Sequence, residues 1–326
     1  MGQLEAPTAA WVSLLGGDPG SYRSHPLHSP ERTYVETNCY TDILIELLHA
    51  AGYEPLAAMG ATLRMDFEGD QWTFLKPHPQ DLETLFGVDI HEMQPYRDIP
   101  QQAAEQIAEG RTLIVELDSF HLPDTASTSY RREHVKSSVV LESIDLRAQR
   151  LRYFHATALH ELAEDDYRGV FRIGREPQPD VLPPYTELVR FDAGPRLEGA
   201  ELHQAALTLA RAHLDRRPAS NPFLRFGDAL QRDLPRLLEG DAADYHAYAF
   251  ATVRMAGSAF EAAASMAAWL LAEPDAVSAP LTRIVEGCKA LSFRLARRRE
   301  FDPRETVAAL ASAWDQALTT LDREIP

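Results

Sequence analysis

Two residues far apart in the sequence have the properties of a nucleophile and its base. Cys39 follows Thr37 and Asn38, which can both cap a helix, so the spacing places its thiol in a first helical turn. Unpaired backbone N–H groups and the positive end of the helix dipole favour a thiolate there. His134 opens a predicted strand of the sheet that should pack on this helix, and a cysteine nucleophile commonly finds its histidine far away in sequence. The pattern indicates covalent chemistry at sulfur.

Cysteine and histidine residues at such positions also occur in purely structural roles. A free cysteine in an apolar helix is most often a small core residue, and a histidine at a strand start often only forms a hydrogen bond. His49 lies on the helix of Cys39, but the helical rise puts it about 15 Å away, too far for a base. Cys288 stands inside a predicted helix without a comparable setting, and we expect it to be structural.

Several familiar chemistries have no motif in this sequence. A glycine-rich phosphate loop followed by lysine, a dinucleotide fingerprint and a Gly-x-Ser-x-Gly elbow are all missing. The acidic run at residues 66–70 begins like a calcium loop, but its glycine comes one place early and Pro77 replaces the distal glutamate. His160-Glu161 resembles half of a zinc-binding helix motif without the second histidine. We therefore expect no metal site and no cofactor.

The composition is that of a folded, acidic protein. A length of 326 residues suits about two domains, and 45% of the residues are apolar. The 49 acidic and 32 basic residues give a net charge of −17, which argues against a nucleic-acid partner because such affinity depends on neutralising phosphates. Two cysteines cannot form a disulfide framework, so we expect a cytoplasmic protein. Polar residues interrupt the most apolar stretch, 256–272, so we expect no membrane span.

The apolar pattern predicts the elements that must position the cysteine and the histidine. An amphipathic helix begins at Thr37-Asn38 and ends at Gly52, and a second helix covers 99–109. Strands are predicted at 112–117, 134–144 and 150–155. Three strands so close in sequence favour a mostly antiparallel sheet packed on the helix of Cys39.

The chain divides by composition into an arm and two domains. Residues 1–33 are predicted to be an irregular N-terminal arm, because glycine and proline break every periodicity. Residues 34–196 form the α+β domain, and prolines between 174 and 196 indicate a linker or an edge strand at its end. Residues 197–326 form an all-α helical bundle. Its helices are predicted near 198–215, 223–239, 242–271, 277–299 and 303–323.

Three segments carry a resemblance to a known family. They are Asn38-Cys39-Tyr40-Thr41-Asp42 with Glu46-Leu47-Leu48-His49, the run from Asp66 to Phe74, and the run from Asp118 to Lys136. These segments resemble DUF1839, a bacterial family of unknown function, over most of the chain up to about Phe191 and more loosely over the helical tail. The order of a helix-borne cysteine, a strand ending in Asp, a Leu-Pro loop and a histidine is similar to the papain-like group that includes the butirosin-pathway acyltransferase. The resemblance implies a papain-like domain.

The same resemblance implies a function. It suggests a cysteine-dependent acyltransferase that moves an aminoacyl or related acyl group from a carrier-protein thioester to an acceptor, through an acyl-cysteine intermediate. Cys39 would match the nucleophile and His134 the base. The third member stays open, because His155 occupies the place where an Asp or Asn commonly stands, and Asp118 at the end of the preceding strand could orient the base instead.

Further residues complete the predicted site. The residues expected to hold an oxyanion or the substrate are Asn38, Trp72 and Tyr130. A phosphopantetheine-bearing carrier protein is acidic, so docking would need a basic face. That face is expected at Arg131, Arg132 and Lys136, whose alternative role is a solvated surface with internal salt bridges.

Two other functions fit the same residues. The first is a non-catalytic accessory protein that binds a carrier protein or an acyl-enzyme through the same surface. The second is a papain-like cysteine amidase or peptidase. An acyl adduct that depends on Cys39 would distinguish transfer from simple binding.

Overall fold

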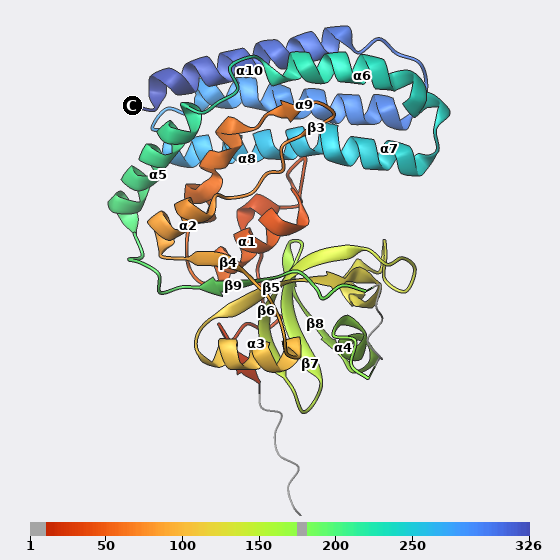
Figure 1. The fold of residues 1–326 in the computed structure, drawn as a ribbon. Coiled ribbons are helices and arrows are strands. Elements are labelled where there is room, and N and C mark those ends of the chain that lie inside the picture. Colours follow the sequence, from red (N-terminus) through yellow and green to blue (C-terminus); the bar gives the residue numbers. More distant parts are fainter. Residues whose placement is uncertain (1–10, 175–180) are drawn as a thin grey trace, which may run out of the picture. The chain divides into compact units, whose positions relative to one another are not determined.

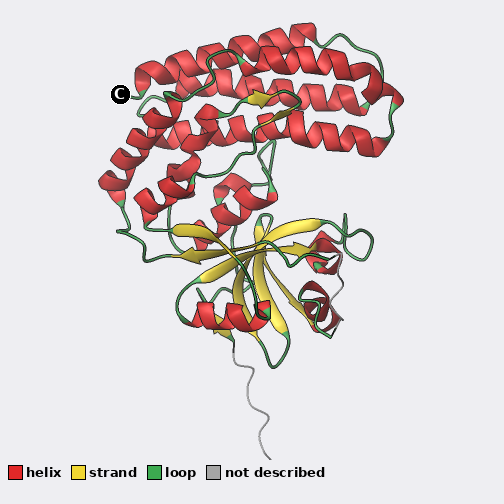
Figure 2. Ribbon diagram, in the orientation of Figure 1, coloured by secondary structure: helices red, strands yellow, loops and turns green. Residues whose placement is uncertain are grey.

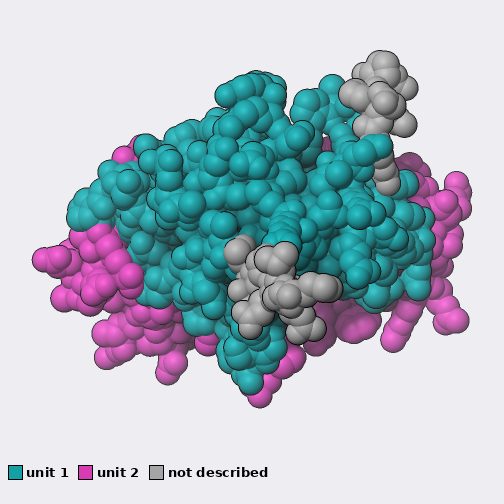
Figure 3. Space-filling view, turned by 90° about the horizontal axis from the view of Figure 1, so that it is seen from below, with its two compact units in different colours: residues 1–25, 42–53, 86–195 teal, residues 26–41, 54–85, 196–326 magenta. Residues whose placement is uncertain are grey.

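The computed structural model describes residues 11–174 and 181–326 (Figure 1), with a sheet-containing part and a helical part (Figure 2). The described residues form two compact units, coloured in Figure 3. Unit 1 comprises those within 1–25, 42–53 and 86–195, and unit 2 comprises 26–41, 54–85 and 196–326. The division drawn along the sequence was continuous, with its boundary after residue 196. In the structure each unit is assembled from three segments of the chain, and residues 26–41 and 54–85 belong to the same unit as the C-terminal helices.

Unit 1 is built on an antiparallel sheet, as the sequence predicted. The strand order is β4-β9-β5-β6-β7-β8, and β1 also pairs with β6. The strands are β1 (Val12–Ser13), β4 (Asp89–Met93), β5 (Thr112–Asp118), β6 (Lys136–Asp145), β7 (Arg150–His155), β8 (Ala158–Ala163) and β9 (Thr186–Arg190). The predicted strand start at His134 is corrected, because Asp118 and Lys136 form the last pair of the β5–β6 register. His134 therefore lies in the loop before β6.

The proline-rich segment at the end of unit 1 contains β9, which is an interior strand of the sheet. β9 pairs with β4 on one side and with β5 on the other. The sequence predicted a linker or an edge strand between 174 and 196, and this interior position corrects it. Pro183 and Pro184 precede β9 and so remove no hydrogen bond from its ladders. Pro177 and Pro179 lie outside the described residues.

The two faces of the sheet are covered by different helices. Leu117, Val139 and Tyr153 belong to one core with α3 (Ile99–Ala108) and α4 (Glu164–Val170). On the opposite face, Tyr22 packs against Phe154 with ring centroids 5.4 Å apart. Because strand side chains alternate between faces, Asp118 lies on the Phe154 face, and Ser137 and His155 lie on the α3 and α4 face.

Helix α1 (Cys39–Ala50) confirms the predicted amphipathic helix, and its residues from Asp42 onward belong to unit 1 with the sheet. The side-chain oxygen of Asn38 accepts the Thr41 N–H at 2.9 Å, which is the usual geometry of an N-cap. Tyr22, which packs on Phe154, donates its hydroxyl hydrogen to the buried carboxylate of Glu46 in α1. The apolar side chains of α1 are almost fully buried, namely those of Ile43, Leu44, Leu47 and Leu48.

The N-terminal segment of unit 1 is attached to the sheet from residue 12 onward. β1 pairs with β6, and the buried Glu142 carboxylate of β6 accepts hydrogen bonds from the backbone of Leu15 at 3.0 Å and Gly17 at 3.2 Å. The hydroxyl of Ser13 donates to the same oxygen at 2.8 Å. The predicted arm therefore contains a short strand, and its first ten residues lie outside the described part of the chain.

Unit 2 contains the predicted helical bundle. Its helices are α5 (Gly199–Leu214), α6 (Pro222–Glu239), α7 (Ala242–Ala249), α8 (Met255–Leu270), α9 (Asp275–Ala296) and α10 (Arg304–Glu324). A π-helical turn at Phe250–Arg254 joins α7 to α8, so the long helix predicted over 242–271 is one path with a local change of winding.

Residues 54–85 supply short elements to unit 2. They are the 3-10 helix η2 (Pro55–Arg64), the hairpin of β2 (Phe67–Glu68) and β3 (Gln71–Trp72), and the start of α2 (Pro79–Phe86). Trp72 packs against Phe223 of α6 and Phe260 of α8, with ring centroids 4.8 and 6.1 Å apart. This aromatic contact explains why the segment belongs with helices that lie far away in sequence.

Candidate functional site

Cys39 is the first residue of α1, and it is partly exposed. Residues on either side of Cys39 form hydrogen bonds that hold the start of the helix to the backbone at Leu75. The side-chain amide of Asn38 donates to the Leu75 carbonyl at 2.9 Å, and the hydroxyl of Thr41 donates to the same carbonyl at 2.6 Å. The position of the thiol is thereby fixed in the first helical turn, next to the dipole end that favours anions.

The second cysteine is in a different setting. Cys288 of α9 is buried, and burial raises the pKa of its thiol to about 12. A buried thiol with this pKa is protonated at neutral pH and out of reach of a substrate. Cysteine chemistry in this chain therefore has one candidate, Cys39.

His134 and Asp118 form an exposed imidazole–carboxylate pair. Nδ1 of His134 lies 2.7 Å from Oδ2 of Asp118, and because a carboxylate only accepts, Nδ1 carries the hydrogen. The other Asp118 oxygen accepts the Phe120 N–H at 3.1 Å, and the Phe120 ring stacks on the imidazole at 4.5 Å. The His134 side chain is 69% exposed. With Nδ1 held by the carboxylate, Nε2 is left available, which is the arrangement of a general base with its orienting acid.

His155 belongs to a second, separate network. Its Nδ1 lies 2.5 Å from Oδ2 of Asp124, its Nε2 lies 2.6 Å from the hydroxyl of Ser137, and the Tyr153 hydroxyl donates to the other Asp124 oxygen. The order serine, imidazole, carboxylate is that of a hydrolase triad. The His155 side chain, however, is only 9% exposed. Both of its nitrogens are occupied, so the network fastens the loop of Asp124 to β6 and β7.

The charges in this second network are coupled. Burial by itself would raise the pKa of Asp124, but the hydrogen bond and charge of His155, the charge of His160 and the bond from Tyr153 outweigh burial and lower it. Burial also lowers the pKa of His160, against the opposing effect of Asp124. An ionised Asp124 is thus part of the folded structure.

The structure separates the two candidates for a third member. Asp118 contacts His134, whereas His155 contacts Ser137 and Asp124 on the opposite face of the sheet. The candidacy of His155 is therefore corrected, since alternation along β7 turns its side chain away from the face of Asp118. The pairing of Cys39 with His134 stays a prediction.

The two predicted substrate-binding aromatics have structural partners. Trp72 is 3% exposed and lies in the aromatic core of unit 2, which corrects its assignment to a substrate surface. The Tyr130 hydroxyl donates to Asp166 at 2.9 Å. Asn38, predicted to hold an oxyanion, is 3% exposed and uses its side chain as the helix cap and as the donor to Leu75.

The predicted basic face is largely engaged in internal ion pairs. Arg131 contacts Asp166 at 2.5 Å, and Lys136 contacts Glu116 at 2.6 Å. Among the described residues, Arg132 donates only to the Ser127 carbonyl, at 3.5 Å. Exposed pairs of this kind contribute little energy and can exchange for a partner's charges, so a docking role stays a prediction.

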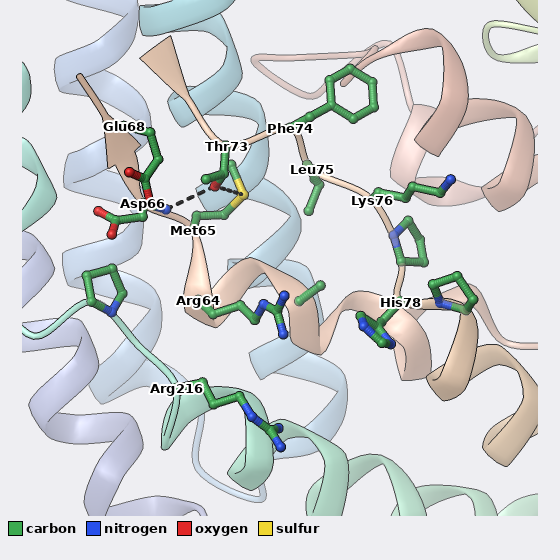
Figure 4. Close-up of a pocket in the computed structure, with 14 residues that line it drawn as sticks. Arg64, Met65, Asp66, Glu68, Thr73, Phe74, Leu75, Lys76, His78 and Arg216 are labelled. Carbon is green, nitrogen blue, oxygen red and sulfur yellow. Dashed lines mark hydrogen bonds between the residues drawn. The ribbon is translucent and has the colours of Figure 1, made fainter. Parts of the chain in front are cut away.

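A cavity of about 510 Å³ lies in unit 2 beside the segment that fastens α1. Leu75 and Lys76 line it, and Lys76 Nζ stands 3.9 Å from the ring centroid of Tyr40, next to Cys39. Figure 4 shows its other lining residues, which include the basic side chains of Arg64, His78 and Arg216. The sequence reasoning missed this cluster, because no motif joins residues from such distant segments.

The family assignment follows from comparisons of the whole sequence. The DUF1839 N-terminal domain matches residues 23–191, and the DUF1839 C-terminal domain matches residues 199–323. The chain belongs to the DUF1839 family. The N-terminal match carries both Cys39 and the His134–Asp118 pair, while the C-terminal match covers the bundle from α5 to α10. None of the curated proteins compared matches the chain.

Two sequence features that resemble metal sites have local explanations. Asp66, at the start of the calcium-like run, forms an ion pair with Arg225. His160 lies on strand β8, so it is not part of a zinc-binding helix, and Glu161 beside it contacts Arg150 and Arg152. Within the described residues, no three His, Cys, Asp or Glu side chains gather closely enough to hold a metal ion. None of the described helices combines the length and apolarity needed to cross a membrane.

Proposed function

We propose that this protein is a cysteine-dependent acyltransferase. Cys39 is the nucleophile, His134 is the base, and Asp118 orients the base. The donor is an aminoacyl or related thioester on a carrier protein. The observation that supports the proposal most directly is the His134–Asp118 contact of 2.7 Å, which fixes one nitrogen of an exposed imidazole and leaves the other accessible.

The chemistry proceeds in two halves. In the first, Nε2 of His134 takes the proton from the Cys39 thiol, and the thiolate attacks the carbonyl carbon of the donor thioester. The tetrahedral oxyanion is stabilised by backbone N–H groups at the start of α1. The bond between the acyl carbon and the carrier's sulfur then breaks, and the departing sulfur takes the proton from His134. The products are an acyl-Cys39 thioester and the free carrier thiol.

The second half releases the acyl group. An acceptor amine attacks the acyl-Cys39 carbonyl, its proton passes to Nε2 of His134, and the sulfur of Cys39 leaves and regains that proton. Exchange of one thioester for another conserves the bond type, so the first half is close to balanced in free energy. The formation of an amide drives the second half.

Intact-mass measurement after mixing the protein with a loaded carrier tests the proposal. We expect a mass increase equal to the acyl group in the wild-type protein and in Cys288→Ala, and no increase in Cys39→Ala. Cys288→Ala is the matched control, because its thiol is buried. An adduct that persists in Cys39→Ala overturns the proposal.

Two other results of the same experiment would replace the proposal. A stable complex with the carrier without any adduct supports the accessory protein instead. Turnover of a simple amide that is lost in Cys39→Ala, without transfer to any amine, supports the amidase or peptidase. Melting curves of all variants establish that each is folded.

A further inference from the structure

We propose that the cavity of about 510 Å³ in unit 2 binds a phosphorylated small molecule, whose phosphate group contacts Arg64 and Arg216. The ligand has the size class of a phosphopantetheine or a mononucleotide, because pockets of roughly 300–1,000 Å³ enclose molecules of this kind. Cys39 is not among the residues that line this cavity, so the binding site does not require Cys39 to be a nucleophile.

The basic side chains occupy a defined part of the cavity. Arg64, His78 and Arg216 also line a second cavity of about 430 Å³, which the acidic residues Asp66 and Glu68 do not line. The three basic groups therefore stand where the two cavities adjoin. Figure 4 shows Asp66 and Glu68 toward one side of the cavity and His78 toward the other.

The two arginines lack acidic partners among the described residues. The Arg64 side chain has no hydrogen bond or ion pair there, and Arg216 donates only to the Ala212 carbonyl, one turn earlier, at 3.2 Å. Their neighbours differ, since Arg211 and Arg217 both contact Asp322. In a chain with a net charge of −17, two arginines that line the same cavity and lack acidic partners form a local positive field.

Two of the acids near the cavities, Asp66 and Asp81, contact basic side chains that do not belong to the proposed phosphate site. Arg225 forms an ion pair with Asp66 from outside the cavity. Asp81, which lines the second cavity, contacts Nε2 of His213 at 2.6 Å in a buried pair. Glu68 is exposed and lies on the far side from His78. The charge presented at Arg64 and Arg216 is therefore available to an anion.

The remaining lining suits the body of an amphipathic ligand. Met65, Leu75 and Pro77 give an apolar wall, and the Phe74 ring at the cavity is 52% exposed. The Leu75 carbonyl is held by Asn38 and Thr41, which flank Cys39. Guanidinium groups contact phosphate oxygens in a planar, two-pronged manner that ammonium groups cannot reproduce. The cavity thus combines a phosphate end with an apolar path beside the start of α1.

Calorimetric titration of the full-length protein with defined probes tests this site. We expect 4′-phosphopantetheine to bind at least 10-fold more tightly than pantetheine, which lacks only the phosphate. AMP and inorganic phosphate identify the source of the phosphate. Tighter binding of AMP keeps the phosphate site but assigns it to a nucleotide, and inorganic phosphate alone should bind more weakly than either.

Variants connect the affinity to the named side chains. Arg64→Ala and Arg216→Ala should each weaken 4′-phosphopantetheine binding about 10-fold or more, whereas Arg217→Ala, whose side chain contacts Asp322, should leave it unchanged. Cys39→Ala should also leave it unchanged, which separates this proposal from the acyl-transfer proposal. Equal affinity for pantetheine and 4′-phosphopantetheine, equal affinity in all variants, or no binding of any probe overturns the site. Melting curves show that each variant is folded.

Discussion

Two imidazole–carboxylate pairs lie on opposite faces of the same sheet, and burial is the main difference between them. In each pair Nδ1 contacts an aspartate, at 2.7 Å in His134–Asp118 and at 2.5 Å in His155–Asp124. The His134 side chain is 69% exposed, and the His155 side chain is 9% exposed. The same two chemical groups therefore meet with different consequences.

The difference shows how burial divides structural from chemical roles. An exposed pair adds little to the free energy of folding, so its geometry is free to serve a reaction. A buried pair is stable only when its remaining atoms have partners, and Tyr153 and Ser137 supply these to Asp124 and His155. Contact geometry alone would have favoured the buried pair, because its atom order is that of a triad.

Replacing the exposed histidine should have the largest effect on chemistry. His134→Gln is expected to lower the rate of Cys39 acylation by a loaded carrier by about 10²–10⁴-fold, because the general base is lost. The melting temperature should hardly change, since the side chain is exposed. His91→Gln is a matched control, because His91 is also an exposed histidine, 3.1 Å from Asp89. Equal rates in the His134 and His91 variants would contradict the assignment of the base.

Replacing the two aspartates should lower the free energy of unfolding by very different amounts. Asp124→Ala leaves His155 and Tyr153 buried without their shared partner, and we expect it to lower the free energy of unfolding by about 3 kcal/mol or more. Asp118→Ala removes an exposed contact and should cost about 0–1 kcal/mol. Urea unfolding of the two variants at pH 7 measures both values. Similar losses for both would show that burial does not distinguish the pairs.

The buried pair also predicts a dependence of stability on pH. The pKa of Asp124 is lower in the folded protein than its ordinary value of 3.8, so its ionised form stabilises the fold. This contribution is fully present above the unfolded-state pKa and is lost as the pH falls through the folded-state pKa. The difference in unfolding free energy between wild type and Asp124→Asn should therefore be constant near neutrality and shrink below about pH 4. A difference that grows on acidification would contradict the direction of the shift.

Local sequence patterns predicted much of the fold. The α5–α10 bundle was predicted because each helix is a run of apolar residues bounded by proline or glycine, and β5 and β7 because they are short β-branched or apolar runs. β8 was missed because its buried residues Leu159 and Leu162 are three apart, a helical spacing. The place of residues 54–85 was missed because Trp72 finds its partners Phe223 and Phe260 far along the chain.

The contacts of the candidate site were also only partly predictable from the sequence. The contact of His134 with Asp118 could be predicted, because both stand at the ends of adjacent predicted strands. The Ser137–His155–Asp124 network could not, because strand register and the fold of the 119–133 loop bring these residues together. Arg64 and Arg216 likewise share a cavity only through the packing of η2 on α5. Neither arrangement leaves a signal in residue spacing.

The smallest expected effect decides whether the buried network is only structural. Ser137→Ala removes the partner of Nε2 of His155, and we expect a loss of about 1 kcal/mol in stability. Acylation of Cys39 should proceed at the wild-type rate, because this network lies on the opposite face of the sheet from Asp118, the partner of His134. Unfolding in urea and intact mass after carrier treatment measure the two quantities. A wild-type protein that reacts with a fluorophosphonate at Ser137, together with loss of acyl transfer in Ser137→Ala, would move the chemistry from the exposed histidine to the buried one.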